Sequence, residues 1–398
     1  MLRTYKYRVY PTKDQVLKLE STFELCRNLY NASLQQRRDA YKSVNPRSVF
    51  YNQQQNELPE LKAAFPDYKN IHSLVLQDVL HRTDKAMKGF FLRLKTKNSK
   101  AGYPRYKSYG RYDSITYSQS GFEILQSNKK RTYVALSKIG NIKIVYHREI
   151  PAVANIKTCI VKRDGKKWFV CFAIETNIIT KPVKIKTEVG IDMGLTSFLA
   201  TSDNRLIPNP RILRESENKL AIEQRKLAKK KKGGKNRLKQ TQKVRNVHTK
   251  IFNQRNDFQH KVSRKLVNEY DFIAHEDLNI KGMVKNHCLA KSISDVGWGK
   301  FISMVRYKAE EAGKVTVAVN PKNTSQECFG CGKLVPKTLQ DRIHKCPYCG
   351  LTLDRDVNSA KVILSRGKEL ALHNKRLGRN YKAKIVSMNQ EAPSFRAE

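Results

Sequence analysis

The chain has 398 residues, which is too long for a single ordinary hydrophobic core, so two or three folded domains are expected. Its residues are 39% hydrophobic, which excludes wholesale disorder. It carries 78 Lys and Arg against 35 Asp and Glu, and this net charge of +43 favours a polyanionic partner, nucleic acid ahead of a membrane surface. The sequence contains no run of eighteen apolar residues and no signal-peptide pattern at its start, so we expect a cytoplasmic protein without a membrane span.

The amino-terminal hundred residues predict one strand followed by helices. Residues 4–10 alternate like a half-buried strand. Thr12 and Gln15 then match a capping box, and the residues after them have the three-and-four spacing of an amphipathic helix. A polar stretch weakens this spacing, which returns over residues 71–94. We therefore expect a helical block that extends to about residue 100.

Residues 112–175 change to the two-residue period of β-strands. Two hairpins are predicted there, and the second turns at Asp164-Gly165, a favourable pair for a tight turn. Short strands separated by such turns are typical of a small barrel. We expect the first strand of the chain to join this barrel, with the helical block inserted between them.

A new unit starts near Glu188 with two short strands, and a long basic tract follows them. Residues 224–256 include 13 Lys or Arg and no acidic residue, and apolar residues at helical spacing continue to Leu266. A run of charge is commonly just the solvated face of a helix. Solvated helices normally mix both signs of charge, however, so the missing acids favour a helix that faces phosphate groups.

The remaining elements alternate between strands and helices. A short buried strand ends at Glu276, a helix is centred on Phe301 and Val305, and residues 314–320 form the last clear strand. After Arg366 the sequence becomes polar and basic, and we expect this tail to be poorly ordered.

Four of the eight cysteines form the pattern C-x2-C-x14-C-x2-C, while the other four are scattered singly as small core residues. In a cytosolic chain this spacing is typical of tetrahedral zinc, because each pair offers two thiolates to one ion. Two disulfides are the alternative, which a reducing cytosol disfavours. Four sulfur ligands leave no open position for a substrate, so the expected ion is structural. The predicted ligands of this one Zn²⁺ are Cys328, Cys331, Cys346 and Cys349.

Three acidic residues lie in apolar surroundings, where burying a carboxylate is costly without a partner. Asp192 is in the GIDMG segment of a strand, Glu276 ends another strand, and Asp356 precedes a helical pattern. Carboxylates repel a phosphodiester unless divalent cations lie between them. Two Mg²⁺ or Mn²⁺ ions could activate a water on one side and stabilise the leaving oxygen on the other. The three acids together indicate a two-metal nuclease site.

Each acid also has an ordinary structural interpretation. Asp356 alone would be a helix N-cap, and Glu276 alone would be a solvated acid at a strand end. Asp354 and Asp277 are close neighbours in the sequence that could be the ligands instead. Spacing alone leaves the catalytic and the structural interpretations open.

The sequence resembles TnpB, the OrfB-type family of insertion-sequence proteins ancestral to type V CRISPR effectors. The matching stretches include YKYRVYPTKDQ, GIDMGLTSFLATSDN, HEDLNIKGM, NPKNTSQECFGCG and KCPYCGLTLDRDVNSAKVIL, in the order of the family, and the resemblance extends to about residue 366. It implies an RNA-guided DNA endonuclease with one two-metal RuvC site. The implied partners are a guide RNA from the transposon end and double-stranded target DNA, bound by a monomeric protein in a prokaryotic cytoplasm.

The resemblance also assigns roles by motif. Asp192, Glu276 and Asp356 match the Asp-Glu-Asp triad of RuvC, which would hold Mg²⁺ or Mn²⁺. The four cysteines match the zinc element that loads the target strand into the nuclease.

The implied fold is an α/β multidomain protein with an RNase H-like (RuvC) nuclease domain. The expected parts are a wedge β-barrel over residues 1–11 and 109–185, a helical recognition domain over 12–108, the nuclease domain over 186–327 and 350–366, a zinc-ribbon-like element over 328–349, and the basic tail over 367–398.

The wedge and recognition domains would grip the guide RNA and read a short T-rich motif beside the target, while base pairing reads the rest. The basic tract would contact the phosphate backbone. The candidate contacts are Tyr51, Gln77, Lys107, Lys229, Lys230, Lys231, Lys232, Arg237 and Arg245.

Three other functions fit parts of the sequence. A nuclease-inactive, RNA-guided DNA-binding repressor of the same family would have damaged acids, whereas this triad is intact. A plain RNA-binding or ribosome-associated protein would not need three acids in apolar strands. A DNA-joining transposase is disfavoured because no nucleophilic Tyr or His pair stands out.

Overall fold

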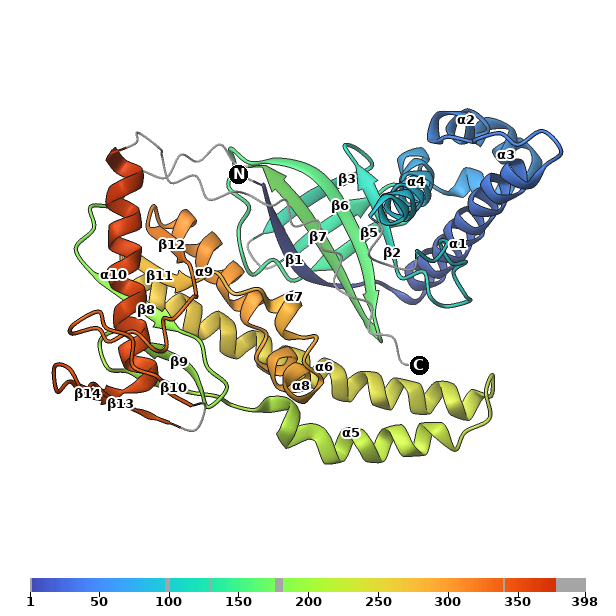
Figure 1. Cartoon of the computed structure of the whole chain (residues 1–398). Helices are drawn as coiled ribbons and strands as arrows, with labels where there is room; N and C mark the ends of the chain where they lie inside the picture. Colours follow the sequence, from blue (N-terminus) through green and yellow to red (C-terminus); the bar gives the residue numbers. More distant parts are fainter. Residues whose placement is uncertain (1, 97–100, 129–130, 176–181, 339–340, 377–398) are drawn as a thin grey trace. The chain divides into compact units, whose positions relative to one another are not determined.

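The computed structural model describes residues 2–96, 101–128, 131–175, 182–338 and 341–376. The chain divides into two compact units, Met1–Ile178 and Ile179–Glu398, and each has a sheet of its own (Figure 1). Across the described ranges, none of the helices combines the length and the apolar character needed to cross a bilayer.

The first unit is built on an antiparallel sheet of seven strands. The strands are β1 (Leu2–Tyr10), β2 (Ser114–Ser118), β3 (Phe122–Asn128), β4 (Arg131–Leu136), β5 (Gly140–Ile144), β6 (Asn155–Asp164) and β7 (Lys167–Glu175). Their order in the sheet is β2-β6-β7-β1-β5-β4-β3, so the first strand of the chain lies between later ones, as predicted. Tyr5, Tyr7 and Val9 alternate along β1 and are buried on its inner face. The predicted second hairpin is present, but its two-residue turn is Gly165-Lys166, one residue later than expected, because Asp164 still pairs with Lys167.

This sheet is rolled rather than flat. β2 and β3 are its two edge strands, yet only residues 119–121 join them in the chain. Six strand spacings of about 4.8 Å would separate the edges of a flat sheet by about 29 Å, whereas the four Cα steps of this connection reach about 15 Å at most. The edges must therefore approach each other at this turn.

Helices inserted between β1 and β2 share one hydrophobic core with the sheet. They are α1 (Lys13–Lys42), α2 (Tyr51–Asn56), α3 (Leu58–Ala64), the 3-10 helix η1 (Pro66–Asn70) and α4 (Ser73–Lys95). The predicted capping box is confirmed: Gln15 N–H donates to Thr12 Oγ1 at 3.3 Å, and Thr12 N–H donates to Gln15 Oε1 at 3.0 Å. Phe23 of α1 packs against Trp168 of β7, with ring centroids 5.6 Å apart.

α1 continues through the polar stretch that weakens the apolar pattern, because its polar side chains are paired in the interior. Arg37 is 7% exposed and donates from Nε to Gln54 Oε1 at 2.9 Å and from Nη1 to Asp84 Oδ1 at 3.1 Å. The hydroxyls of Ser33 and Thr83 lie 2.8 Å apart. A helix held in this way has no periodic apolar signal.

The second unit contains a mixed sheet of five strands. The strands are β8 (Glu188–Asp192), β9 (Ser197–Thr201), β10 (Leu206–Pro208), β11 (Phe272–Glu276) and β12 (Val315–Val319). Their order is β10-β9-β8-β11-β12; the first three are antiparallel, while β8, β11 and β12 are parallel. Every residue of β11 is buried, as expected for a central parallel strand covered on both faces.

Helices cover both faces of this sheet (Figure 1). They are α6 (Lys235–Glu269), α7 (Ile280–Met283), α8 (His287–Val296), α9 (Trp298–Glu311) and α10 (Arg355–Arg376), whereas α5 (Ile212–Ala228) packs on α6 away from the sheet. On one face, Phe301 of α9 packs edge to face on Phe198 of β9, with centroids 4.9 Å apart. On the other face, Ile363 of α10 packs against Phe272 of β11.

The basic tract spans the end of α5, a connection at residues 229–234 and the first part of α6. Gly233 in the connection has φ +84°, a conformation that ends a helix and favours glycine. Val244, Val247 and Ile251 are buried along one stripe of α6, as the spacing predicts.

The prediction of a poorly ordered tail is wrong for residues 367–376. α10 continues to Arg376 because its apolar stripe still faces the sheet: Ala371 packs against the cluster around Phe272. Residues 377–398 lie outside the described residues.

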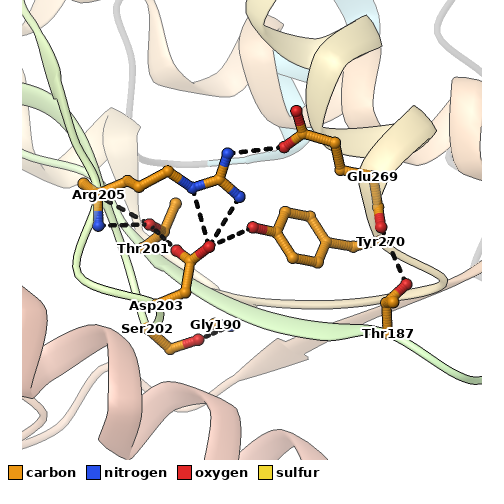
Figure 2. A network of polar contacts seen from close by, with 8 residues as sticks. All are labelled: Thr187, Gly190, Thr201, Ser202, Asp203, Arg205, Glu269 and Tyr270. Atoms are coloured by element: carbon orange, nitrogen blue, oxygen red, sulfur yellow. Dashed lines mark hydrogen bonds and ion pairs between the residues drawn. The ribbon is translucent and has the colours of Figure 1, made fainter.

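A polar network fixes the amino ends of β8 and β11 (Figure 2). The Tyr270 hydroxyl donates to Asp203 Oδ2 at 2.6 Å, and Arg205 donates to the same oxygen at 2.8 Å and to Glu269 Oε2 at 2.9 Å. The Thr187 hydroxyl donates to the backbone oxygen of Glu269 at 2.9 Å. These bonds tie the turn between β9 and β10 to the end of α6.

Candidate metal sites

Two of the three predicted acids end neighbouring parallel strands. Asp192 is the last residue of β8 and Glu276 is the last residue of β11. The register pairs Ile191 with His275, so the two acids lie level with each other one step further along. Level residues on adjacent strands point to the same face of a sheet. Here that face is the one covered by α10, because Phe272 and Ala274, at alternate positions before Glu276, pack on that helix.

The third acid is brought to this edge by α10, which lies directly on the strand backbones. A Cβ atom at Gly190 would lie 2.0 Å from the backbone oxygen of Ala360, and a Cβ at Gly367 would lie 2.6 Å from Ala274 Cβ. Asp356 is in the first turn of α10. A Cβ at Gly194, just after β8, would lie 3.7 Å from Asp356 Oδ2, so this carboxylate lies beside the end of β8.

The neighbouring acids have other positions. Asp354 Oδ1 accepts the N–H groups of Asp356 and Val357 at 2.9 and 3.1 Å, so Asp354 caps α10 and capping does not account for the Asp356 side chain. Asp277 is exposed, one residue past the end of β11.

The surroundings of Asp192 and Glu276 disfavour the ionised form of both side chains. Desolvation, together with the carboxylates of Glu276 and Asp356, raises the pKa of Asp192 well above its usual value, and Arg355 offsets only part of this. Desolvation also raises the pKa of Glu276, although the Thr324 hydroxyl and Arg366 oppose the shift. A cation between the carboxylates would remove this repulsion, and hard oxygen ligands suit Mg²⁺ or Mn²⁺.

The His275 side chain stabilises the end of β11 and has no role in proton transfer. Its Nδ1 lies 2.9 Å from the backbone oxygen of Glu276, and Arg306 Nε lies 3.3 Å from its Nε2. Burial lowers the pKa of His275 to about 4, so the ring is neutral at physiological pH and can donate from Nδ1 while it accepts at Nε2.

The four predicted cysteines gather in a small hairpin between β12 and α10, which includes β13 (Ile343–Lys345) and β14 (Thr352–Asp354). Their Sγ atoms all lie within 4.8 Å of one another; Cys328 and Cys349 are 3.6 Å apart, and Cys331 and Cys346 are 3.5 Å apart. A tetrahedral ion with Zn–S bonds of about 2.3 Å separates its sulfurs by about 3.8 Å, whereas a disulfide needs about 2.05 Å. The arrangement therefore fits one four-coordinate ion.

The backbone around the cluster favours the thiolate of Cys346, whereas desolvation and hydrogen bonds among the thiols raise the pKa values of Cys331 and Cys349. Desolvation opposes the ionisation of Cys346, but the N–H groups of Cys349 and Tyr348 and the neighbouring thiols lower the pKa of Cys346 to about 6. Thiolate is the form that binds zinc.

Within the described ranges, these cysteines are the one group of three or more candidate ligand atoms that all lie within 4.8 Å of one another. Asp192, Glu276 and Asp356 do not form a group of this kind.

Asn358 connects the two sites, a role that its place in the sequence does not predict. It lies two residues after Asp356, is fully buried, donates from Nδ2 to the backbone oxygen of Glu327 at 2.7 Å and accepts the N–H of Phe329 at 3.0 Å. These two bonds flank Cys328, so the cysteine hairpin is fastened to the helix that carries the third acid.

The predicted nucleic-acid contacts of the second unit differ in their surroundings. Lys229, Lys230, Lys231 and Lys232 are exposed in the connection between α5 and α6, and Arg245 is exposed on α6.

Arg237 is already engaged within the protein. Its Nη1 donates to the backbone oxygens of Leu227 and Lys230, both at 2.9 Å, and these bonds satisfy carbonyls at the end of α5. Arg237 therefore stabilises the end of α5, and whether it also contacts nucleic acid stays a prediction.

The three candidates of the first unit do not share one environment. The ring of Tyr51 stacks on His81 with centroids 3.8 Å apart, Gln77 is half-buried in α4, and Lys107 is exposed with Nζ 5.6 Å from the Tyr30 ring centroid. Whether these residues contact nucleic acid stays a prediction.

Comparison with protein families gives three matches. A family described as "Probable transposase" (OrfB, IS605 type) matches residues 169–287, and the Cas12f1-like TNB domain matches residues 298–363, which include the cysteine hairpin. A helix-turn-helix domain matches residues 1–45, although this segment folds as strand β1 and the single helix α1.

Curated relatives cover most of the chain. A protein of Streptomyces pristinaespiralis, named as a candidate RNA-guided DNA endonuclease, is 36% identical over 92% of this chain and 89% of its own length. An Escherichia coli K12 protein with the same kind of name is 28% identical over 92% of both chains. Cas12f1 of Sulfoacidibacillus thermotolerans is 26% identical over 59% of both chains.

Solved structures share the fold. A Cas12f1–sgRNA–target DNA complex matches with a TM-score of 0.53 at 15% identity, over 88% of this chain and 82% of the other. The mini-RNA-guided endonuclease CRISPR-Cas_phi3 matches with a TM-score of 0.52 at 9% identity, over 92% of each chain. The predicted α/β multidomain fold with a zinc-ribbon-like domain is confirmed at this level.

Proposed function

Because the chain belongs to the OrfB-type, or TnpB, family of insertion-sequence proteins, we propose that it is an RNA-guided DNA endonuclease. The names of its relatives and its net charge of +43 support this activity. The observation that carries the proposal is that three acids from distant parts of the chain lie close together. Asp192 and Glu276 are at the ends of β8 and β11, and Asp356 approaches them from α10. Burial and the carboxylates of Glu276 and Asp356 raise the pKa of Asp192.

The proposal extends to the domains. Three antiparallel strands followed by two parallel ones, with helices on both faces, support a RuvC-like RNase H domain. The rolled sheet of the first unit supports a wedge barrel. The proposed bounds are 1–11 and 109–185 for the wedge, 12–108 for the recognition domain, 186–327 and 350–366 for the nuclease domain, and 328–349 for the zinc element.

The three acids would hold two Mg²⁺ or Mn²⁺ ions, which would supply an activated water and stabilise the leaving oxygen of a phosphodiester. Asp192 and Glu276 would offer their carboxylates from rigid strand ends, and Asp356 from a helix that packs on the backbone of β8. The four cysteines would hold one structural Zn²⁺. Asn358 would keep this zinc hairpin beside the nuclease site.

The partners would be a guide RNA from the transposon end and double-stranded DNA with a T-rich flanking motif, bound by one protein molecule. The exposed lysines at residues 229–232 would contact phosphates, which gives affinity without reading sequence.

A plasmid-cleavage assay tests the proposal. The protein with its co-purified RNA should cleave a matching plasmid in Mg²⁺, and Asp192→Ala should abolish cleavage while guided DNA binding is retained. Asp277→Ala, which removes an exposed neighbouring acid, is the matched control and should cleave like the wild type. Cleavage by Asp192→Ala would remove this residue from the site, and guided binding without cleavage by the wild type would favour the nuclease-inactive repressor.

A further inference from the structure

The loop at residues 320–327 joins β12 to the first cysteine and is held in place by α10. Arg366 Nη1 donates to the backbone oxygens of Asn320 at 3.1 Å and Lys322 at 2.8 Å, and Arg366 also pairs with the Glu327 carboxylate. Asn358 Nδ2 donates to the backbone oxygen of Glu327. The loop therefore has a fixed position relative to the sheet, although it has no regular secondary structure of its own.

Thr324 lies in the middle of this loop and is 3% exposed. Its hydroxyl hydrogen-bonds to Glu276 Oε1 and lies 3.0 Å from the backbone oxygen of Pro321. Within the described residues, this is the one hydrogen bond to the Glu276 carboxylate, and it leaves Oε2 for another ligand. Glu276 is itself 9% exposed, so water contributes little to holding its side chain.

We propose that Thr324 is a positioning residue: its hydroxyl fixes the Glu276 carboxylate in the orientation that binds the divalent cation. The inference rests on the proposed function, because it concerns the same metal site. Glutamate has three rotatable side-chain bonds. If its carboxylate must first be ordered toward the cation, the site binds the cation more weakly. Partners that orient metal ligands typically contribute 10–100-fold to metal affinity.

Two substitutions separate the hydroxyl from the shape of the side chain. Thr324→Val keeps the volume and removes the hydroxyl, whereas Thr324→Ser keeps the hydroxyl. Thr352→Val, at an exposed threonine of β14, is the matched control. Zinc content reports whether the cysteine hairpin, which follows the loop directly, stays assembled.

The experiment measures Mn²⁺ binding to the RNA-loaded protein. The electron paramagnetic resonance signal of free Mn²⁺ reports how much of the ion stays unbound. The Asp192→Ala complex serves as the baseline, because RNA binds Mn²⁺ as well. Sites that Asp192→Ala loses are counted as triad sites.

We expect Thr324→Val to weaken Mn²⁺ binding at these sites by about 10–100-fold, while Thr324→Ser stays within about threefold of the wild type. The Mg²⁺ concentration for half-maximal cleavage should rise in parallel for Thr324→Val. Zinc content should stay at one ion per chain in all variants, and Thr352→Val should change nothing.

Unchanged Mn²⁺ affinity in Thr324→Val would overturn the inference, as would equal losses in Thr324→Val and Thr324→Ser. Loss of zinc in Thr324→Val would assign Thr324 a structural role and overturn it too. A wild-type complex without any Mn²⁺ site that Asp192→Ala removes would refute the proposed metal site itself, which is a distinguishable result.

Discussion

At the scale of single residues, Asp192 carries a charge that the metal-free fold disfavours. Burial and two neighbouring carboxylates raise the pKa of Asp192 above its unfolded value of about 3.9. An acid with a raised pKa in the folded state contributes stability below its unfolded pKa and loses that contribution as the pH rises through the folded pKa. The metal-free protein therefore loses the contribution of Asp192 toward neutral pH.

We predict that Asp192→Asn stabilises the metal-free protein at pH 7.5 by about 1 kcal/mol, although it abolishes cleavage, because it removes one of three repelling charges. Thermal unfolding without added divalent metal measures this effect, with Asp277→Asn as the exposed control. The gain in Tm over the wild type should grow from pH 5 to pH 8. A lower Tm for Asp192→Asn across this range would contradict the account.

The capping box and the positions of the acids at strand ends and at a helix start could be predicted from sequence, because each stands in a recognisable local pattern. Thr324 and Asn358 could not be predicted, since their partners Glu276 and Glu327 are far away in the sequence and a polar residue in a loop or helix has no period. Arg237 has a structural contact that its charge did not indicate: its guanidinium hydrogen-bonds to carbonyls at and just after the end of α5.

At the scale of elements, the contact of α10 with β8 brings the third acid to the strand ends. Gly190 allows this contact, because a side chain there would meet the backbone of α10 at Ala360 and Leu364. The backbone of a helix cannot turn away as a flexible side chain can.

We predict that Gly190→Ala destabilises the protein by about 1–3 kcal/mol or more, because the methyl group must push α10 away from β8. Urea unfolding of the whole chain measures the loss. Gly102→Ala is the matched control, since an added Cβ there has no atom within 4 Å. Equal stability of the two variants would show that α10 is free to move.

The cysteine hairpin is the second element that can be tested alone. We predict that Cys328→Ser lowers the zinc content measured by elemental analysis, because one of four sulfur ligands is lost. Cys288, which was expected in the core, is exposed, and Cys288→Ser outside the cluster should keep one zinc per chain. Full zinc occupancy in Cys328→Ser would overturn the ligand assignment.

The observed boundaries of helices and strands agree with the predicted ones where apolar residues are periodic, and differ from them elsewhere. The stripe of α6 was predicted from Val244 and Val247, and the cap of α1 from Thr12. The length of α1 was not, because Arg37 is held by buried polar contacts. α10 likewise extends past the expected start of the tail at residue 367.

At the scale of the whole molecule, the net charge of +43 predicts strongly salt-dependent RNA binding. We predict that replacing all four lysines at residues 229–232 by glutamine reduces the slope of log Kd against log salt concentration by up to about 3, or about 0.7–0.9 for each phosphate that the variant no longer neutralises. Filter binding of the guide RNA at several salt concentrations measures the slope.

Arg237→Gln is the contrasting variant, because its guanidinium hydrogen-bonds to carbonyls of α5 and of the connection. It should lower the Tm and leave the slope unchanged. An unchanged slope in the quadruple variant would place the RNA elsewhere on the protein.

The overall architecture was predictable mainly through the resemblance to a family. Charge, cysteine spacing and three acids indicated nucleic-acid binding, zinc and hydrolysis, but spacing alone left the acids open to structural roles. The single core shared by α1 and the first sheet was not predicted, because it depends on contacts such as Phe23 with Trp168 that join distant segments.

The most direct test of the central claim is anomalous diffraction from crystals of the RNA-loaded protein with Mn²⁺ in place of Mg²⁺. We expect Mn²⁺ peaks bound by oxygens of Asp192, Glu276 and Asp356 together. Peaks that contact none of these carboxylates, or only one of them, would contradict it.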